Sequence, residues 1–268
     1  MELAAIDWKR VRRTLLRQSR LCAIPERKVE ETLGLLPPMI DICGDYSRSR
    51  KVAERVGMLL MRTDVPEVIV PTCPAYPNRS GRYHRVHTLG SGVSLLTRLH
   101  LPFLERLAAL IPMIRVTILV ADFEAEDRIL RQATGLTREA FIDRVHRTAA
   151  ATRALVRPFG WNAKLFSDFM PSFLEARTQA VKWIGSVPAF DPQLRADTLA
   201  RSDFYRLYYP NGTFNRMMGR TIKAAAEYTV LGDEAAARGL IIVNHTTTSL
   251  SWYLRTQAAF LQNPIRTY

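Results

Sequence analysis

The sequence has few cysteines, no long apolar run and few acidic residues, and each shortage excludes a class of protein. Three cysteines occur, far apart: Cys22, Cys43 and Cys73. This argues against a disulfide framework or a zinc knuckle and predicts a reducing, cytoplasmic location. The longest apolar stretch, 107–121, is broken by Pro112 and Arg115, so we expect no membrane-spanning helix. The first residues are acidic and short in apolar length, so we expect no secretion signal.

Glycine-rich nucleotide-binding motifs are also missing. The chain contains neither Gly-x-Gly-x-x-Gly nor Gly-x-x-x-x-Gly-Lys-Ser/Thr, and Gly90-Ser91-Gly92 lacks the third glycine. This disfavours a bound dinucleotide or a P-loop nucleotide, and we expect no cofactor. His84-x-x-His87 has a spacing that suits a metal ion, but no third ligand stands nearby. We therefore predict no metal site.

The shortage of acids leaves a strongly basic chain. The 268 residues include 38 Lys and Arg against 25 Asp and Glu, which gives a net charge of +13. Most of the basic residues are arginine, with 32 Arg and 6 Lys. The planar guanidinium can donate two parallel hydrogen bonds to the oxygens of a phosphate. We therefore expect a polyanionic partner, a nucleic acid before an anionic membrane. A hydrophobic content of 47% is enough for an ordinary folded core.

Strand patterns alternate with helix patterns along the chain. Buried strands are predicted over 67–72, 115–121, 163–167 and 239–243. Helices are predicted over 8–20, 47–62, 95–111, 138–157, 171–184 and 216–231. This alternation predicts an α/β fold, with a parallel β-sheet flanked by helices. No linker is evident, so we predict a single domain, 1–268, with a basic N-terminal helical extension over about 1–62. The helix 8–20 carries six bases and no acid.

The predicted helix over 138–157 has two different faces. Its apolar residues Phe141, Val145, Leu155 and Val156 share one broad side, and the opposite side is basic. The basic residues there are His146, Arg147, Arg153 and Arg157. Such a face is either an ordinary solvated surface or a surface that follows nucleic-acid phosphates, and the sequence leaves both readings open.

Reactive side chains stand at the carboxyl ends of three predicted strands. They are Thr72-Cys73, Asp122 and Asn244-His245. Ligands of open α/β sheets bind outside these strand ends. Together the residues can supply a nucleophile, a carboxylate and a proton carrier. Glu227-Tyr228, at the end of the helix before the last strand, is a candidate to join them.

Four stretches of the chain resemble the tRNA-dependent cyclodipeptide synthases. The run 120–127 with 135–140 and Arg147-Thr148 is similar to the family's strand, acidic loop and basic helix. The runs 164–168 and 173–178 resemble its next strand and helix. The runs 222–228 and 240–249 resemble the helix that carries a catalytic Glu and the final strand. The likeness covers roughly 65–255 and rests on the order of elements.

The resemblance implies a Rossmann-like fold, related to class I aminoacyl-tRNA synthetases but without ATP chemistry. Aminoacyl-tRNA is the implied partner. It would dock on the basic helix through Arg138, His146, Arg147, Arg153 and Arg157. An enzyme nucleophile would take the aminoacyl group, a second aminoacyl group would attack it, and ring closure would release a diketopiperazine.

The resemblance also implies roles at the strand ends. Thr72 or Cys73 is the expected nucleophile, Glu227 the amine anchor or proton carrier, and His245 a hydrogen-bonding partner. The substrate pocket is expected at Asp122, Glu124, Tyr228 and Asn244. From charge alone, Asp122 and Glu124 favour a basic amino-acid substrate.

The chain departs from the family pattern at three positions. Thr72-Cys73-Pro74 stands where the family has its catalytic Ser, Lys223 replaces the Tyr four residues before the Glu, and Asn244 stands where the final Tyr is expected. These differences indicate a divergent branch and leave the nucleophile open between Thr72 and Cys73.

Three alternatives remain at this stage. The first is an isocyanide synthase acting on an amino acid, although Tyr76 stands where that family has a Lys. The second is a non-catalytic RNA-binding module with a Rossmann-like fold. The third is a membrane-surface protein anchored by 8–20, which ranks last because one short basic helix binds a bilayer weakly.

Overall fold

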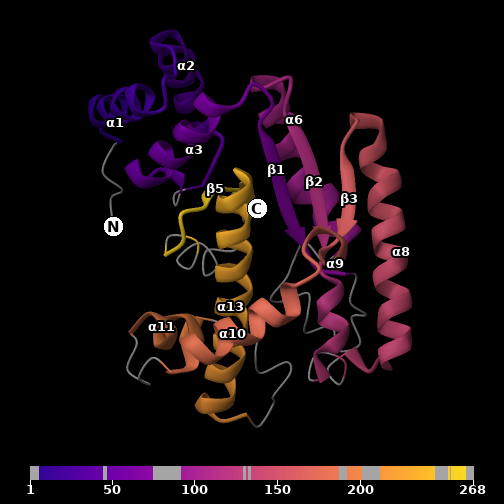
Figure 1. Ribbon diagram of the computed structural model, residues 1–268. Coiled ribbons are helices and arrows are strands. Elements are labelled where there is room, and N and C mark those ends of the chain that lie inside the picture. Colours follow the sequence, from indigo (N-terminus) through magenta and orange to yellow (C-terminus); the bar gives the residue numbers. More distant parts are fainter. Residues whose placement is uncertain are drawn as a thin grey trace. The chain divides into compact units, whose positions relative to one another are not determined.

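A computed structural model of the chain describes residues 6–44, 47–74, 92–128, 131, 134–186, 192–200, 212–244, 253 and 255–263. The chain folds as two compact units (Figure 1). The first unit comprises 1–70, 99–116 and 232–268, and the second comprises 71–98 and 117–231. No helix in these described ranges is long and apolar enough to cross a bilayer.

A parallel β-sheet organises the fold. Its strands are β1 (Glu67–Thr72), β2 (Arg115–Val120), β3 (Asn162–Leu165), β4 (Ile241–Asn244) and β5 (Ala259–Gln262). The strand order is β3-β2-β1-β4-β5. The parallel register sets Val68 beside Ile241, Ile118 beside Ala163, and Ile242 beside Phe260. This order is that of Rossmann-type sheets, and the apolar, buried strands suit a sheet covered on both faces.

Helices of the first unit pack around one another at a glycine. The helices here are α1 (Trp8–Leu21), α2 (Glu26–Asp41), α3 (Arg50–Arg62) and α6 (Leu101–Leu110). A Cβ atom added at Gly57 of α3 would lie 3.0 Å from a methyl carbon of Leu15 and 3.0 Å from one of Leu36. The absence of a side chain at Gly57 thus lets α1 and α2 approach α3 closely.

The second unit is built on α8 (Arg138–Val156), which Thr137 caps by accepting a hydrogen bond from the Ala140 amide at 3.2 Å. Phe141 and Val145 of α8 are buried against Val120 and Ala125. Shorter helices of this unit are α5 (Val93–Leu95), α9 (Phe166–Phe169), α10 (Phe173–Ser186) and α11 (Pro192–Ala200). Two 3-10 turns, η3 (Asp122–Glu126) and η4 (Arg157–Phe159), flank α8. The long helix α13 (Phe214–Arg238) belongs to this unit up to Leu231.

Most predicted elements are confirmed, and the differences have local causes. The predicted helix over 95–111 is divided, because a π-helical turn, η2 (Leu96–His100), precedes α6. The predicted strand over 163–167 ends at Leu165, where α9 begins. Helices α2 and α11 and strand β5 were not anticipated.

Candidate active site

The end of β1 places Thr72 and Cys73 at the carboxyl edge of the sheet. The carbonyl oxygen of Thr72 accepts a hydrogen bond from the Ala121 amide at 3.0 Å, which fixes the end of β1 beside the end of β2. The Thr72 side chain is buried, and its Oγ1 atom has no hydrogen-bond partner within the described ranges. Cys73 follows immediately and is half-buried. The thiol is therefore the first reactive group beyond the strand.

The Cys73 thiol forms a side-chain hydrogen bond with Glu124, which stands in η3 directly after β2. Burial raises the pKa of the Cys73 thiol well above its usual value, and the negative charges of Glu124 and Glu227 raise it further. Burial likewise raises the pKa of Glu124 to about 8, with repulsion from Glu227 and Asp127 adding to the effect and Arg220 opposing it. Near neutral pH this pair is therefore mostly protonated and uncharged.

Two guanidinium groups hold Glu227 of α13 beside this pair. Arg177 Nη1 of α10 lies 3.1 Å from Glu227 Oε1, and Arg220 Nη1 lies 3.8 Å from the same oxygen. Arg220 also forms a 2.7 Å ion pair with Asp127 Oδ2, at the end of η3. Arg220 and Glu227 are about two helical turns apart and so share one face of α13. The four side chains form one ion-pair network, in which Asp127 is buried and the other three side chains are 13–18% exposed.

An aromatic cluster supports Arg177 from the other side. The Arg177 guanidinium carbon lies 5.4 Å from the centre of the Phe123 ring. Phe123 in turn packs against Phe173 at 4.7 Å and Phe166 at 5.1 Å between ring centres. Such a cation–ring contact restricts the orientation of the guanidinium. The Phe123 contact and the Glu227 ion pair therefore fix Arg177 in one position.

This arrangement has the parts that acyl transfer needs. Cys73 is a thiol with a hydrogen-bonded carboxyl partner, the pairing that activates a nucleophile. Glu227 is a carboxylate, the type of group that binds an ammonium, and two cations hold it in position. Arg177 and Arg220 place positive charge next to the reacting groups. Cys73, Glu124, Glu227, Arg177 and Arg220 all belong to the second unit, and we call them the thiol–carboxylate cluster.

Asp122 and Tyr228, two other predicted pocket residues, stand near this cluster in the sequence. Asp122 Oδ1 accepts a hydrogen bond from the Ser167 amide at 3.2 Å, so it ties η3 to the start of α9. Tyr228 is half-buried and follows Glu227 on α13. Of the three predicted acidic residues, Glu124 and Glu227 belong to the cluster, whereas Asp122 accepts a hydrogen bond from a backbone amide.

The predicted residues on β4 belong to the first unit. Asn244 is buried at the end of β4, where its amide nitrogen lies 3.4 Å from the Tyr253 hydroxyl. The backbone carbonyl oxygen of Asn244 accepts a hydrogen bond from the backbone amide of Asn263 at 2.8 Å. His245 lies outside the described residues, as do His84 and His87.

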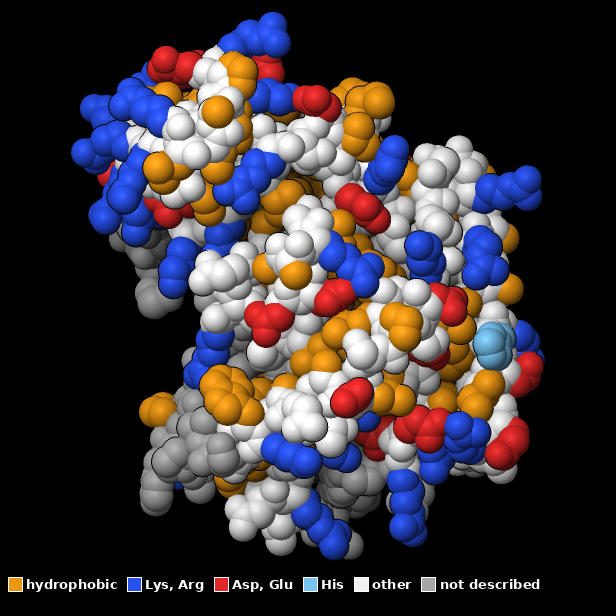
Figure 2. All heavy atoms as spheres, viewed as in Figure 1, with side chains coloured by type: hydrophobic (Ala, Val, Ile, Leu, Met, Phe, Trp, Pro, Cys, Tyr) orange, Lys and Arg blue, Asp and Glu red, His pale blue; other side chains and the backbone are white. Residues whose placement is uncertain are grey.

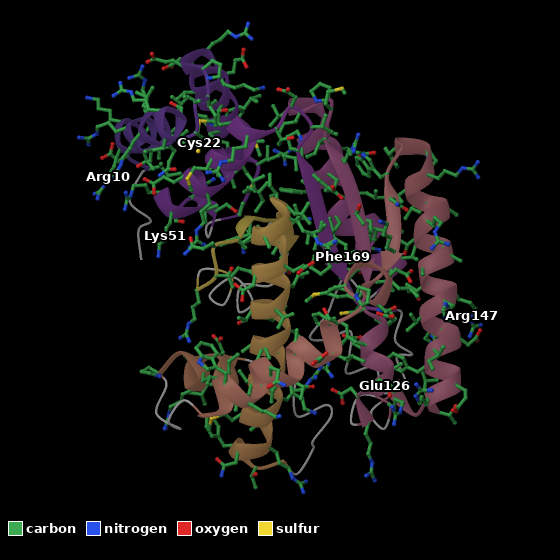
Figure 3. The ribbon with its side chains drawn as sticks, in the orientation of Figure 1. Arg10, Cys22, Lys51, Glu126, Arg147 and Phe169 are labelled. Carbon is green, nitrogen blue, oxygen red and sulfur yellow. The ribbon has the colours of Figure 1, made fainter. Side chains whose placement is uncertain are left out.

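The basic residues of α8 differ in their partners. His146, Arg147, Arg153 and Arg157 are all exposed, and Arg147 projects from the side of α8 that faces away from β3 (Figure 3). Arg147 forms a 2.7 Å ion pair with Asp143, and Arg153 Nε donates to the Ala163 carbonyl of β3 at 3.4 Å. Arg138, at the start of α8, binds Glu126 through Nε at 3.0 Å. His146 and Arg157 form no ion pair with a described residue.

Arg177, Arg220 and Asp127 were missed by the sequence analysis. The helical spacing of Arg220 and Glu227 was a usable signal, since residues two turns apart lie on one face. No sequence pattern links α10 to α13, so the pairing of Arg177 with Glu227 depends on the tertiary fold.

Comparisons with known proteins relate the chain to two solved structures. No protein-family model matches it, and no curated protein matches it in sequence. The structure is similar to a tyrosyl-tRNA synthetase from Archaeoglobus fulgidus, crystallised with L-tyrosine. The TM-score is 0.50 and the identity 14%, over 89% of this chain and 64% of that chain. It is also similar to a cyclodipeptide synthase (CDPS) from Staphylococcus haemolyticus, with a TM-score of 0.47 and 12% identity. That match covers 79% of this chain and 94% of the other.

The likeness to the synthetase concerns the fold. At this identity it shows a shared Rossmann-like architecture, which agrees with the strand order of the sheet. The chain spans about two thirds of the synthetase's length. The predicted Rossmann-like α/β fold is thus confirmed.

Proposed function

We propose that the protein is an enzyme that takes an aminoacyl group from aminoacyl-tRNA and, with a second such group, forms a cyclic dipeptide. The observation that carries this proposal is the thiol–carboxylate cluster at the carboxyl edge of a Rossmann-like sheet. There the Cys73 thiol is hydrogen-bonded to Glu124, and Glu227 is held by Arg177 and Arg220. Of the two predicted nucleophiles, Cys73 is favoured because its thiol is hydrogen-bonded to Glu124, whose carboxylate form, populated as the pH approaches about 8, can take the thiol proton.

The first step loads the enzyme. The Cys73 sulfur attacks the carbonyl carbon of the aminoacyl ester, so a carbon–sulfur bond forms and the bond to the ribose oxygen of the tRNA breaks. The thiol proton passes to the Glu124 carboxylate and from there to the departing ribose oxygen. Arg220, which faces both Asp127 and Glu227, supplies positive charge near the developing oxyanion.

The second and third steps make the two peptide bonds. The amine of a second aminoacyl-tRNA attacks the thioester, the carbon–sulfur bond breaks, and the amine proton returns to sulfur. The free amine of the resulting dipeptidyl-tRNA then attacks its own ester, which closes the ring and releases the tRNA. Glu227 anchors an incoming ammonium group. Both steps are acyl transfers without a change of oxidation state, so they need no redox cofactor.

The test is product formation from defined tRNA pools. The protein is incubated with tRNA charged with single amino acids or pairs of them, beginning with Arg and Lys, and cyclic dipeptides are sought by mass spectrometry. We expect a product with the wild type and with Cys22→Ala, which removes an exposed thiol of the first unit, and none with Cys73→Ala. If no pool yields a cyclic dipeptide, the proposed reaction is wrong. Intact tRNA binding in that case would favour a non-catalytic RNA-binding module.

A further inference from the structure

Four arginines of α1 form a straight basic row on the surface of the first unit. Arg10, Arg13, Arg17 and Arg20 follow one another at spacings of three, four and three residues, which puts them on one side of a helix. All four are exposed, and none forms an ion pair with a described residue. Figure 2 shows Lys and Arg side chains gathered over α1, and Figure 3 marks Arg10 among them. We call these four residues the α1 row.

The charge of α1 is not shared by its neighbour. Helix α1 contains no acid, whereas α2 of the same unit contains Glu26, Glu30, Glu31 and Asp41. Among the other bases of α1, Arg12 is neutralised, since its Nη2 lies 2.7 Å from Glu30 Oε1. The row therefore concentrates uncompensated positive charge along one side of α1. The general abundance of arginine in the chain does not account for it, because α2 of the same unit carries four acidic residues.

The dimensions of the row suit a nucleic-acid backbone. Successive members lie about 5 Å apart along the helix axis, given a rise of about 1.5 Å per residue. Guanidinium groups in such a line can each contact a separate phosphate of a nucleic-acid strand. Arginine binds phosphate oxygens through two parallel hydrogen bonds.

An anionic membrane fits this helix less well. Interfacial helices insert an apolar face into the bilayer, but the apolar face of α1 is already used inside the first unit. Val11 and Leu15 have no exposed surface, and Leu15 packs where Gly57 gives it room. Leu21, at the end of α1, is its one exposed large apolar side chain.

We infer that the α1 row is a second RNA-binding surface, separate in sequence from the basic face of α8, which binds the phosphate backbone of tRNA. That the RNA is tRNA rests on the proposed function. The row would add affinity without sequence specificity, because phosphate contacts carry no base information.

The test compares two variants with equal charge. In the row variant, Arg10, Arg13, Arg17 and Arg20 are replaced by Gln. In the control variant, Gln replaces four ion-paired arginines of the same unit: Arg12, Arg27, Arg50 and Arg238. Binding of deacylated tRNA is measured at several salt concentrations. We expect the row variant to bind at least about tenfold more weakly and its log–log salt slope to fall by about 3–4, whereas the control keeps the wild-type slope.

Several outcomes overturn the inference. These are an unchanged slope in the row variant, an equal loss in the control, or row-dependent binding to phosphatidylserine vesicles without binding to tRNA. If the row variant does not fold, Arg13→Gln and Arg17→Gln singly must each lower the slope by about 0.9. No acyl transfer enters this measurement. The two proposals can therefore fail separately. If the wild type makes no cyclic dipeptide but the row variant binds tRNA more weakly, the proposed function is wrong and this inference is supported.

Discussion

Cys73 and Glu124 share a hydrogen bond although they come from different loops, one after β1 and the other after β2. Parallel strands end at the same edge of a sheet, so the fold brings these two loops together. The bond also sets the protonation of both groups. Buried beside Glu227, the pair holds its protons near neutral pH, with the pKa of Glu124 raised to about 8.

The nucleophile is tested by separate changes at Cys73 and Thr72. We expect Cys73→Ala to lower product formation at least about 100-fold, because Cys73 carries the thiol of the described cluster and the other two cysteines belong to the first unit. Thr72→Ala should lower it much less, since the Thr72 hydroxyl is buried and unpartnered among the described residues. Intact-protein mass spectrometry after mixing with charged tRNA should show an aminoacyl adduct on the wild type. An adduct that persists in Cys73→Ala and disappears in Thr72→Ala would reverse the assignment.

Glu124 predicts how the rate depends on pH. Only the carboxylate form accepts the Cys73 proton, so the rate should rise as the pH increases through about 8, the pKa of Glu124. Glu124→Gln removes the base and should lower kcat about 100-fold or more, with a flat profile over that range. Single-turnover transfer of the aminoacyl group measures this step without product release. A wild-type profile that falls between pH 7 and 9 would contradict the role of Glu124 as base.

Sequence patterns predicted four of the five strands and placed several candidate site residues just after them. Aliphatic and β-branched residues indicated β1 and β2, which end at Thr72 and Val120. The residues that follow such strand ends are where α/β sheets bind ligands. The helical pattern around Glu227 was equally clear. These features are local, since each depends on neighbours within a few residues.

Other features depend on long-range packing and left no local mark. Helix α2 contains Pro37 and Pro38, which usually indicate the end of a helix. Strand β5 has only four residues, Ala259–Gln262, too few for a periodic pattern. The pocket role of Asp122 stays a prediction, and no local pattern indicated its hydrogen bond to the Ser167 amide, 45 residues away. The ion pair between Arg177 and Glu227 requires α10 to pack near α13, and no sequence pattern in either helix predicts that packing.

Glu124 also makes stability depend on pH. Its pKa is about 8 when folded, against about 4.3 in an unfolded chain. Between these values the folded protein keeps a proton that the unfolded chain releases, so raising the pH favours unfolding. The contribution is complete below about pH 4 and is lost by about pH 8, and it amounts to a few kcal/mol on an order-of-magnitude basis.

Urea titrations at several pH values check this prediction. The free energy of unfolding of the wild type should fall as the pH rises from about 5 to about 8, and Glu124→Gln should show a flatter curve. Glu126→Gln is the matched control, because Glu126 is exposed and Arg138 lowers its pKa. That variant should run parallel to the wild type over this range. Equal pH dependence in Glu124→Gln and the wild type would show that Glu124 is not the group responsible.

The partners of the α8 arginines predict unequal effects on tRNA binding. Arg157 is exposed and forms no ion pair with a described residue, so Arg157→Gln should lower the log–log salt slope by about 0.9, the value for one phosphate contact. Arg147 already pairs with Asp143, and Arg147→Gln should lower the slope less. Arg153 binds the Ala163 carbonyl, so its replacement should act mainly on stability. Filter binding of deacylated tRNA at varied salt measures the slopes, and no change in any variant would make this face an ordinary solvated surface.

Arg177 is expected to position Glu227, and a double-mutant cycle tests that role. Arg177→Met leaves Glu227 with Arg220 at 3.8 Å as its nearest ion-pair partner in the described cluster. This should cost about 3 kcal/mol, the lower end of the range for a broken buried pair. Glu227→Gln removes the charge that Arg177 compensates, so the double variant should be more stable than the sum of the single effects predicts, by about 1–3 kcal/mol. Additive effects would mean that the pair contributes nothing.

Kinetics separate this role from a purely structural one. Arg177→Lys keeps a positive charge but loses the contact of the planar guanidinium with the Phe123 ring at 5.4 Å. The variant should therefore fold, but its lysine side chain should hold Glu227 less rigidly. If Glu227 anchors the substrate amine, the looser carboxylate weakens binding in the ground state and the transition state alike, which raises KM for aminoacyl-tRNA more than it lowers kcat. Trp183→Ala on the same helix, at an exposed side chain, should leave both constants unchanged. A fall in kcat with KM constant would place Arg177 in the chemical step itself, as an oxyanion partner and not as a support for Glu227.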